Sequence, residues 1–274
     1  MSMPAVASST VALHAVSAGR GPLVVCLHSS GSSSRQWSHL IDSRKDDYRF
    51  IAFDFHGHGR SGDYAGDRYA LRCESDAVWR TIESLHGPAH LVGHSFGGAV
   101  ALDLAVRHPG RFASVTVFEP VLFALLAPGS EGHREIASVG RDIAHHAHAG
   151  QLDVAAAAFI DYWNGPGAWQ SLAVEHRERV QARMVAVARH FGALFADPLP
   201  MERLRSLRTP TLVLRGGCSP RPARDVCARL ATLPSVTTEV FPALDHMAPV
   251  THAQVVNARI AGHLDASTAL PMAA

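Results

Sequence analysis

Short runs of consecutive apolar residues recur along the chain, separated by stretches in which apolar positions follow a helical period. An apolar run without polar interruptions is typical of a strand buried on both faces, as in a parallel sheet. Alternation of such strands with helices predicts βαβ units and an α/β fold, with a mostly parallel sheet flanked by helices. The predicted strands are 11–16, 22–27, 49–53, 89–92, 112–118, 211–215 and 236–241.

The pattern changes between residue 121 and about residue 207, where no strand-like run occurs. Apolar spacing there predicts helices over 136–148, 152–163 and 175–195. We therefore expect a helical insertion over 121–207 within a core domain of residues 1–120 and 208–265, with a loose start over 1–9 and a disordered tail over 266–274. The helices expected in the core are 35–40, 69–85, 99–105, 223–233 and 254–264.

The composition of the 274 residues, 47% hydrophobic and 18% charged, is that of a globular protein with a sizeable core. A formal net charge of +1 offers no electrostatic reason to expect a nucleic-acid or membrane partner. Residues 1–10 lack the basic start of a signal peptide, and no apolar run approaches membrane-spanning length. The four cysteines follow no metal or disulfide spacing, which indicates reduced thiols in a cytoplasmic protein; the oligomeric state is left open.

One motif stands out between a predicted strand and a predicted helix, the stretch from Gly93 to Gly98 that reads G-H-S-F-G-G. G-x-S-x-G in this context is typical of a nucleophilic serine, because small flanking residues allow the sharp turn that exposes the hydroxyl. The helix N-terminus favours negative charge beside Ser95, and the Phe96 N–H is a natural oxyanion donor. A plain Gly-Ser turn is the structural alternative.

Polar residues also follow other predicted strands. A loop of small residues begins at His28, and such a loop can bring a backbone N–H close to a ligand or serve as a linker. The strand 112–118 is followed by Glu119, a carboxylate that is costly to bury unless it is paired. His56 and His58 lie two residues apart without a carboxylate pattern to complete a metal shell, so we expect a structural loop and no metal site.

With a late loop histidine at His246, these motifs give the chain a resemblance to the α/β-hydrolase superfamily over about residues 10–265. Residues 54–61 resemble the D-x-x-G-x-G-x-S loop of that family, and residues 245–249 resemble the segment that carries its catalytic histidine. The helical insertion stands where the family places a cap over the active site.

The resemblance implies that Ser95 is a nucleophile, that His246 is its base, and that the N–H groups of Ser30 and Phe96 form an oxyanion hole. The family often has glycine at the position of Ser29, so the chain departs from its pattern in this loop.

A second departure concerns the acid that would orient the histidine. The family usually places it three residues after a glycine that follows the late strand; counted from Gly216, that position is Ser219, which carries no charge. Some members, certain haloalkane dehalogenases among them, carry the acid after the strand that follows the nucleophile helix. Glu119 stands at that place and is the candidate we favour. Asp225 and a site without an acid are the alternatives.

The leading hypothesis is a serine hydrolase that cleaves a carboxylic ester or related acyl compound, a small molecule, through an acyl-enzyme on Ser95 without any cofactor. Lactonase, thioesterase, C–C hydrolase and cofactor-free haloperoxidase chemistry occur on the same scaffold. A binding protein that has lost catalysis is the non-enzymatic alternative. Contact between the Glu119 carboxylate and the His246 ring would favour the enzyme. The aromatic residues of the insertion are expected mainly in its core: Phe159, Trp163, Trp169, Phe191 and Phe195.

Overall fold

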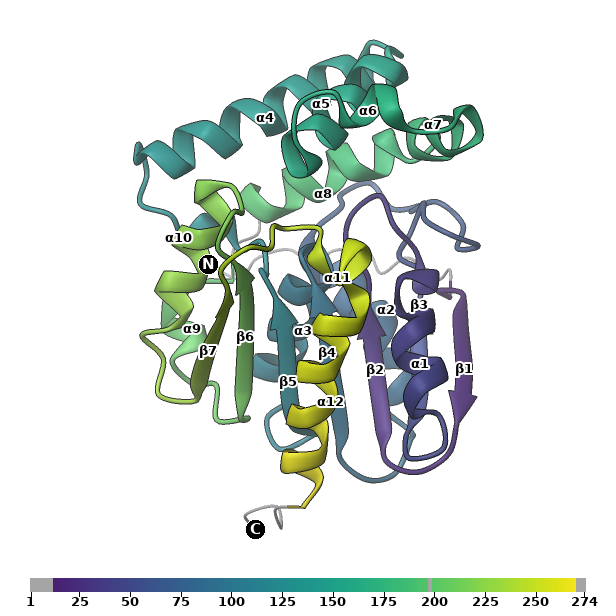
Figure 1. Cartoon of the computed structure of the whole chain (residues 1–274), viewed down its shortest axis with the longest axis vertical. Coiled ribbons are helices and arrows are strands. Elements are labelled where there is room, and N and C mark those ends of the chain that lie inside the picture. The colour runs from purple at the N-terminus through teal and green to yellow at the C-terminus, as the bar shows by residue number, and fades with distance from the viewer. Residues whose placement is uncertain (1–11, 197–198, 270–274) are drawn as a thin grey trace.

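A central sheet of seven strands organises the computed structural model, which describes residues 12–196 and 199–269 (Figure 1). The strands are β1 (Ala15–Gly19), β2 (Leu23–Leu27), β3 (Arg49–Phe53), β4 (Ala89–His94), β5 (Phe112–Phe118), β6 (Thr211–Gly216) and β7 (Val236–Phe241). Their order is β1-β3-β2-β4-β5-β6-β7. Only β1 runs antiparallel to its neighbour, and all other pairs are parallel. The predicted mostly parallel α/β sheet is confirmed.

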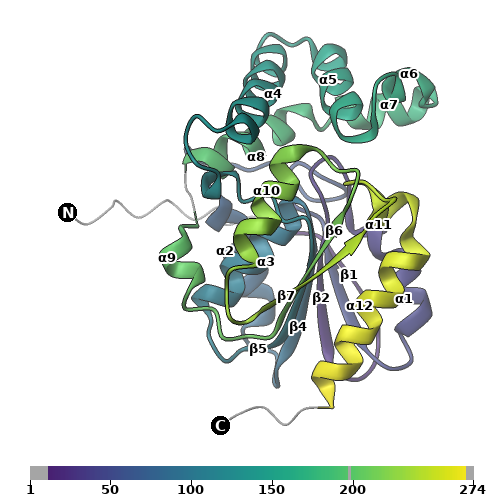
Figure 2. The same cartoon turned by 60° about the vertical axis from the view of Figure 1, so that its left-hand side comes forward.

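Helices cover both faces of this sheet. The helices of the predicted core are η1 (Ser34–Trp37), α1 (Ser38–Arg44), α2 (Leu71–Ile82), α3 (Phe96–Arg107), α10 (Arg221–Leu230), α11 (Ala248–Thr251) and α12 (Ala253–Thr268). Two short helices at the ends of the span 121–207, η2 (Phe123–Leu125) and α9 (Met201–Leu204), pack against α10 and α3 of this core. Val25 and Leu27 of β2 belong to an apolar layer with α2, α3 and α10, whereas Val24 and Cys26 belong to one with α1 and α12. Figure 2 shows these helices on opposite sides of the sheet. Burial on both faces accounts for the apolar runs of the central strands, whereas the edge strands β1 and β7 are partly exposed.

The helical insertion follows η2 and lies over one end of the sheet (Figure 1). It consists of α4 (Glu131–His148), α5 (Leu152–Asn164), α6 (Ala168–Ser171), α7 (Val174–Gln181) and α8 (Met184–Ala196). The single helix predicted over 175–195 is wrong, because the chain turns at Ala182 and Arg183 between α7 and α8. The Arg183 guanidinium donates to the Gly31 carbonyl at 2.6 Å, so this turn connects the insertion to the core.

The C-terminal prediction needs correction for residues 266–268, which are helical rather than disordered. Two side chains of the core fix this helix end: the Thr268 hydroxyl lies 3.2 Å from the Tyr48 hydroxyl and 3.1 Å from His90 Nε2. The rest of the predicted tail, from residue 270, lies outside the described residues.

At the other end, β1 begins at Ala15 rather than at residue 11. The reason is its pairing partner: β1 runs antiparallel to β3, and Ala15 is already opposite Phe53, the last residue of that strand. The predicted loose start over 1–9 and the absence of a signal-peptide pattern over 1–10 concern residues outside the described part of the chain.

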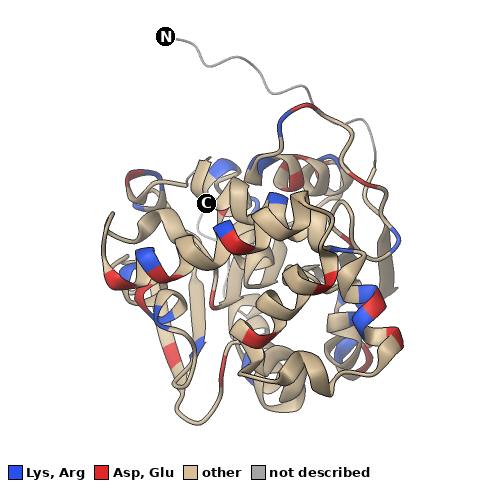
Figure 3. Cartoon of the chain, turned by 90° about the horizontal axis from the view of Figure 1, so that it is seen from above, with Lys and Arg blue, Asp and Glu red and all other residues tan. Residues whose placement is uncertain are grey.

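Three properties of the described residues concern the whole molecule: helix hydrophobicity, cysteine state and the distribution of charge. No helix in residues 12–196 or 199–269 is long and apolar enough to cross a membrane. The four cysteines are free; Cys26 and Cys227 are buried, and burial raises the pKa of each thiol. Figure 3 shows acidic and basic residues interspersed over the face of the helical insertion.

Candidate active site

The serine of the G-x-S-x-G motif lies in a sharp turn between β4 and α3. Ser95 has a φ of 55° and a ψ of −117°, a strained conformation for a residue with a side chain. Backbone hydrogen bonds hold the turn against the next strand: the Ser95 N–H donates to the Phe118 carbonyl at 2.9 Å, and the Val121 N–H donates to the Ser95 carbonyl at 3.3 Å. The serine therefore sits at the tip of a turn that the sheet fixes in place.

Glycines flank this turn because the backbone passes too close for a side chain. A Cβ atom on Gly93 would lie 2.5 Å from the Gly97 carbonyl oxygen, and one on Gly97 would lie 2.2 Å from the Leu27 carbonyl oxygen. Both distances are far below van der Waals contact, and backbone atoms cannot move aside cheaply. The prediction that the turn requires small residues at both flanking positions is confirmed.

Three side chains from distant parts of the chain form one hydrogen-bonded series at the turn. His246 Nε2 lies 3.0 Å from Ser95 Oγ, and His246 Nδ1 lies 2.7 Å from Glu119 Oε2. One neutral tautomer satisfies both bonds: the serine hydroxyl donates to Nε2, and the Nδ1–H donates to the carboxylate. All three residues are buried, with at most 5% of their surface exposed. The fold thus brings together the three residues that the sequence singled out.

The carboxylate of Glu119 is held by donors from the end of β6. Its Oε1 accepts from the Gly216 N–H at 2.7 Å and from the Ser219 hydroxyl at 2.6 Å, while Oε2 accepts from His246. Three donors satisfy this fully buried carboxylate, which offsets its desolvation. Glu119 and Ser95 are the two non-glycine residues with positive φ in the described part of the chain. Strain is thus concentrated at this site.

The other candidate acids lie elsewhere. Asp225 is on α10, where it pairs with Arg221 at 3.4 Å on the surface. The Asp245 carboxylate accepts from the Met247 N–H at 2.9 Å, two residues along its own loop. Neither contacts the His246 ring. Ser219 occupies the position where the family usually has its acid. Its hydroxyl donates to the carboxylate of Glu119, the residue that stands in place of that acid.

The Ser30 loop, residues 28–32, fixes the orientation of one peptide unit. His28 Nε2 accepts from the Phe55 N–H at 3.1 Å, so the proton is on Nδ1, which donates to the Ser29 carbonyl at 2.7 Å. Burial lowers the pKa of His28 to about 3, which keeps this ring neutral. The Ser29 carbonyl also accepts from the Ser32 N–H at 3.1 Å. Because a trans peptide is planar, the fixed carbonyl also fixes the direction of the Ser30 N–H.

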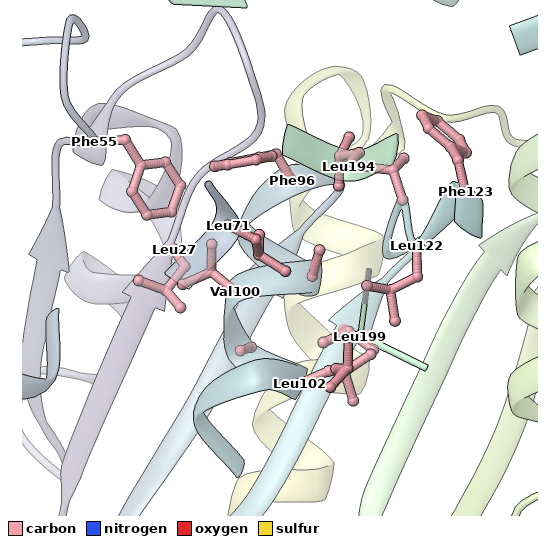
Figure 4. Close-up of a cluster of buried hydrophobic side chains, with 14 of the residues drawn as sticks. Leu27, Phe55, Leu71, Phe96, Val100, Leu102, Leu122, Phe123, Leu194 and Leu199 are labelled. Atoms are coloured by element: carbon pink, nitrogen blue, oxygen red, sulfur yellow. The ribbon is translucent and has the colours of Figure 1, made fainter. Parts of the chain in front are cut away.

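The second candidate oxyanion donor is the first residue of α3. The Phe96 N–H has no intrahelical partner, as at any helix start. Within the described residues, neither this N–H nor that of Ser30 donates to another group. The Phe96 ring meets the Phe55 ring edge-on with centroids 5.4 Å apart, and Figure 4 shows these two side chains next to each other. Both predicted donors are therefore free.

A second hydrogen-bonded chain connects the Ser30 loop to the loop of His246. The Gln36 side-chain oxygen accepts from the N–H and from the hydroxyl of Ser29, both at 3.1 Å. The Gln36 amide donates to His94 Nδ1 at 3.1 Å, and His94 Nε2 donates to the His246 carbonyl at 2.8 Å. Burial and the nearby His246 ring lower the pKa of His94, which stays neutral. Sequence reasoning missed both linking residues; the only signal was that His94 stands inside the serine motif.

The loop after β3 is built around a buried aspartate. Asp54 accepts from the backbone N–H groups of Ser34 at 2.6 Å and Arg60 at 2.9 Å. Burial by itself favours the neutral acid, but these hydrogen bonds outweigh it and lower the pKa of Asp54. The aspartate therefore connects its own loop to the start of η1.

The two histidines predicted to be structural lie in the same loop. His56 Nδ1 is 3.0 Å from the buried Glu74 carboxylate. His58 Nδ1 donates to the His56 carbonyl at 2.9 Å, and its Nε2 accepts from the Gly31 N–H at 3.0 Å. Burial lowers the pKa of His58 to about 4. No group of three or more His, Cys, Asp or Glu residues among the described ones could hold a metal ion.

Aromatic residues of α5 cover the site. The Trp163 ring stacks on the His246 ring, with centroids 3.9 Å apart and planes 28° from parallel. Phe159 lies against the Ser30 loop. Its ring is so close to Gly31 that a Cβ atom on Gly31 would lie 3.0 Å from it. Phe159, Trp163, Trp169 and Phe191 are buried as expected, and Phe195 is partly buried. Trp163 is an exception to a purely internal role, since it also contacts the imidazole beside Ser95.

Matches to known proteins extend over most of the chain. The model of the alpha/beta hydrolase family matches residues 24–259. A probable lysophospholipase, BODYGUARD 2 of Arabidopsis thaliana, is 36% identical over 124 residues, which cover 42% of this chain and 26% of that protein. A pimeloyl-(acyl-carrier protein) methyl ester esterase of Methylococcus capsulatus is 38% identical over 99 residues, 36% of this chain and 37% of that protein. The matches therefore span less than half the length of these curated relatives.

Solved structures share the architecture. A hydrolase from Pseudomonas aeruginosa is similar to this chain with a TM-score of 0.71 and 24% identity, covering 92% of this chain and 94% of the other. At this level of identity the likeness concerns the fold alone.

Proposed function

Because the chain belongs to the alpha/beta hydrolase family, we propose that it is a serine hydrolase that cleaves a carboxylic ester or related acyl compound through an acyl-enzyme on Ser95. The observation that carries this proposal is the hydrogen-bonded series from Ser95 through His246 to Glu119. A serine at a strained turn, an imidazole within hydrogen-bond distance and a buried carboxylate behind it form the arrangement that activates a hydroxyl for acyl transfer.

Each residue of the series has a distinct part in the proposed reaction. His246 Nε2 takes the proton of the Ser95 hydroxyl as Oγ attacks the acyl carbon, and Glu119 stabilises the imidazolium that forms. The imidazolium then gives its proton to the leaving alcohol as the C–O bond breaks. A water molecule, deprotonated by His246, attacks the acyl-enzyme and releases the acid and the free serine.

The proposed oxyanion hole consists of the Ser30 and Phe96 N–H groups. The negative charge that develops on the acyl oxygen needs donors that are already oriented, since reorganisation during the reaction would raise the barrier. The bonds from His28 and Ser32 to the Ser29 carbonyl support this role for Ser30. The start of α3 at Phe96 adds the positive end of a helix dipole.

The proposed substrate is a small acyl compound, and the proposed reaction needs neither metal nor organic cofactor. The name of one relative, a methyl ester esterase, supports ester cleavage. A net charge of +1 supports a small-molecule partner over a nucleic acid or a membrane. The four free thiols support the proposed cytoplasmic location. The helical insertion is proposed to act as a cap, because Trp163 and Phe159 lie over the site.

The binding-protein alternative is weakened by the role of Ser219. This alternative rested on the uncharged residue at the usual acid position, because a site without an acid would be a poor catalyst. Ser219 instead donates to Glu119, whose carboxylate reaches the His246 ring. This contact supports Glu119 as the acid of the proposed site over a site without an acid.

The test is turnover of p-nitrophenyl esters of increasing acyl length, together with labelling by a fluorophosphonate. We expect wild-type protein to hydrolyse at least the short esters and to be labelled once per chain. Ser95→Ala should abolish both, whereas Ser206→Ala, at an exposed serine after α9, should change neither. Turnover and labelling that persist in folded Ser95→Ala would contradict the proposal.

A further inference from the structure

One side chain of the helical insertion contacts both residues of the proposed oxyanion hole. His190 of α8 places Nδ1 2.8 Å from Ser30 Oγ, although the two residues are 160 positions apart. The same ring stacks on the Phe96 ring, with centroids 3.7 Å apart and planes within 2° of parallel. His190 therefore lies between the Ser30 loop on one side and the start of α3 on the other.

The ring of His190 has little freedom to move. It stacks on His58 with centroids 4.8 Å apart and on Tyr69 at 5.8 Å, and it meets the Phe55 ring edge-on at 6.2 Å. It is 1% exposed, and burial together with the neighbouring His58 lowers its pKa, so it is neutral. A ring enclosed in this way keeps Nδ1 at a fixed point beside Ser30.

Gly31, the residue that follows Ser30, is held from two sides through the two peptide units on either side of it. The Gly31 carbonyl accepts from Arg183 at 2.6 Å, which is the second contact from the helical insertion. The Gly31 N–H donates to His58 Nε2 at 3.0 Å, a contact from the core. The Ser30 loop is thus fixed by bonds to the core and to the helical insertion together.

We propose that His190 is a positioning residue of the oxyanion hole, holding Ser30 and Phe96 at the separation at which their N–H groups converge on one oxygen. This inference rests on the proposed function. An oxyanion exists only in the transition state and the tetrahedral intermediate, so a loss of alignment lowers kcat far more than it weakens substrate binding. Because His190 belongs to the helical insertion, the hole also depends on the contact between the insertion and the core.

The test is a double-mutant cycle. His190→Phe keeps a ring above Phe96 and removes the bond to Ser30, whereas Ser30→Ala removes the same bond from the other end. Removal of one oxyanion donor costs about 10² to 10³ in rate, and displacement of a donor costs less. We therefore expect kcat to fall about tenfold to a hundredfold in each single variant, with KM within about twofold. The double variant should be no slower than the slower single variant.

A second readout reports the oxyanion directly. An aryl trifluoromethyl ketone adds to a nucleophilic serine and forms an oxyanion in the hole. Its inhibition constant should rise by the same factor as kcat falls. His145→Phe, at an exposed histidine of α4, is the matched control and should change neither quantity. Circular dichroism and a melting curve establish that each variant is folded.

Four results would overturn the inference. A folded His190→Phe variant with wild-type kcat and a wild-type inhibition constant would contradict the positioning role. A His190→Phe variant that is less stable, but whose folded molecules keep full kcat, would contradict it as well. Losses that add in the double variant show that the two residues act separately. A wild-type protein inert toward both esters and the ketone would instead overturn the proposed function itself, and the inference with it.

Discussion

The Glu119 carboxylate lies 2.7 Å from the His246 ring although the two residues are 127 positions apart. Glu119 follows β5 and His246 follows β7, while β6 lies between these strands in the sheet. Gly216 at the end of β6 and Ser219 in the loop after it donate to the carboxylate oxygen that faces away from the histidine. The carboxylate is thus one strand away from the usual acid position of the family, and the residue at that position orients it.

Glu119→Gln should remove the charge with little change in shape. We expect kcat to fall by about 10³-fold to 10⁴-fold, because an amide can donate to Nδ1 and so favours the histidine tautomer that cannot accept the serine proton. Asp225→Asn is the matched control and should leave kcat unchanged, since Asp225 pairs with Arg221 on the surface. Steady-state kinetics on one p-nitrophenyl ester separates the two. Near-wild-type kcat in Glu119→Gln would remove it as the acid.

Trp163→Ala should affect both stability and catalysis. Truncation of a buried tryptophan costs about 3 to 5 kcal/mol in the free energy of unfolding. Trp169 is equally buried in the helical insertion, so Trp169→Ala should destabilise the protein by a similar amount. Only Trp163 stacks on His246, so only its variant should lower kcat of the folded protein, by about tenfold through a less confined imidazole. The kcat of each variant is measured at urea concentrations at which the variant is still folded. Equal kcat in the two variants would show that the stack has no part in catalysis.

Gln36→Leu should disconnect the Ser30 loop from the loop of His246. The substitution leaves the Ser29 N–H and hydroxyl and the His94 Nδ1 without their partners. A buried polar group without a partner costs about 1 to 3 kcal/mol, and we expect a loss in this range on urea denaturation, with a lower kcat. Gln151→Leu, at an exposed glutamine, is the control and should be close to wild type. A Gln36→Leu variant as stable and active as the control would contradict this role.

Acid should destabilise the protein from about pH 6.5 downward. His28 and His58 have pKa values near 3 and 4 in the folded protein because burial disfavours their charged forms, whereas exposed histidines in the unfolded chain titrate near the ordinary value of about 6.5. Below pH 6.5 these histidines therefore bind protons in the unfolded state but stay neutral in the folded state. Each such histidine lowers the free energy of unfolding by roughly 1 kcal/mol per pH unit until its folded pKa is reached.

Urea midpoints at pH 7, 6, 5 and 4 check this dependence. Carboxylates also affect the free energy of unfolding near pH 4, so a His58→Gln variant is needed to isolate the contribution of the histidine. In this variant the free energy of unfolding should fall less steeply with decreasing pH between pH 6.5 and 5. Identical slopes in wild type and variant would contradict the assignment of His58 as a neutral buried ring.

Local pattern was sufficient for much of the fold. The strands over 49–53 and 112–118 have the predicted bounds, because mostly apolar runs are required wherever a strand is covered on both faces. The edge strand over 236–241 also has the predicted bounds, although its residues are at most partly buried. The boundary between α7 and α8 was missed, since the helical spacing of apolar residues continues through the turn at Arg183.

The serine turn could be predicted from local sequence, because the spacing of Gly93, Ser95 and Gly97 is typical of a strained strand-to-helix turn. The sequence also identified His246 and narrowed the acid to a short set of carboxylates. Three other features depend on how the chain folds in space: the contacts of Glu119 with His246, of Gln36 with His94, and of His190 with Ser30. These contacts join residues far apart in the chain, and the order and register of the strands set their distances. Local periodicity carries no information about that order.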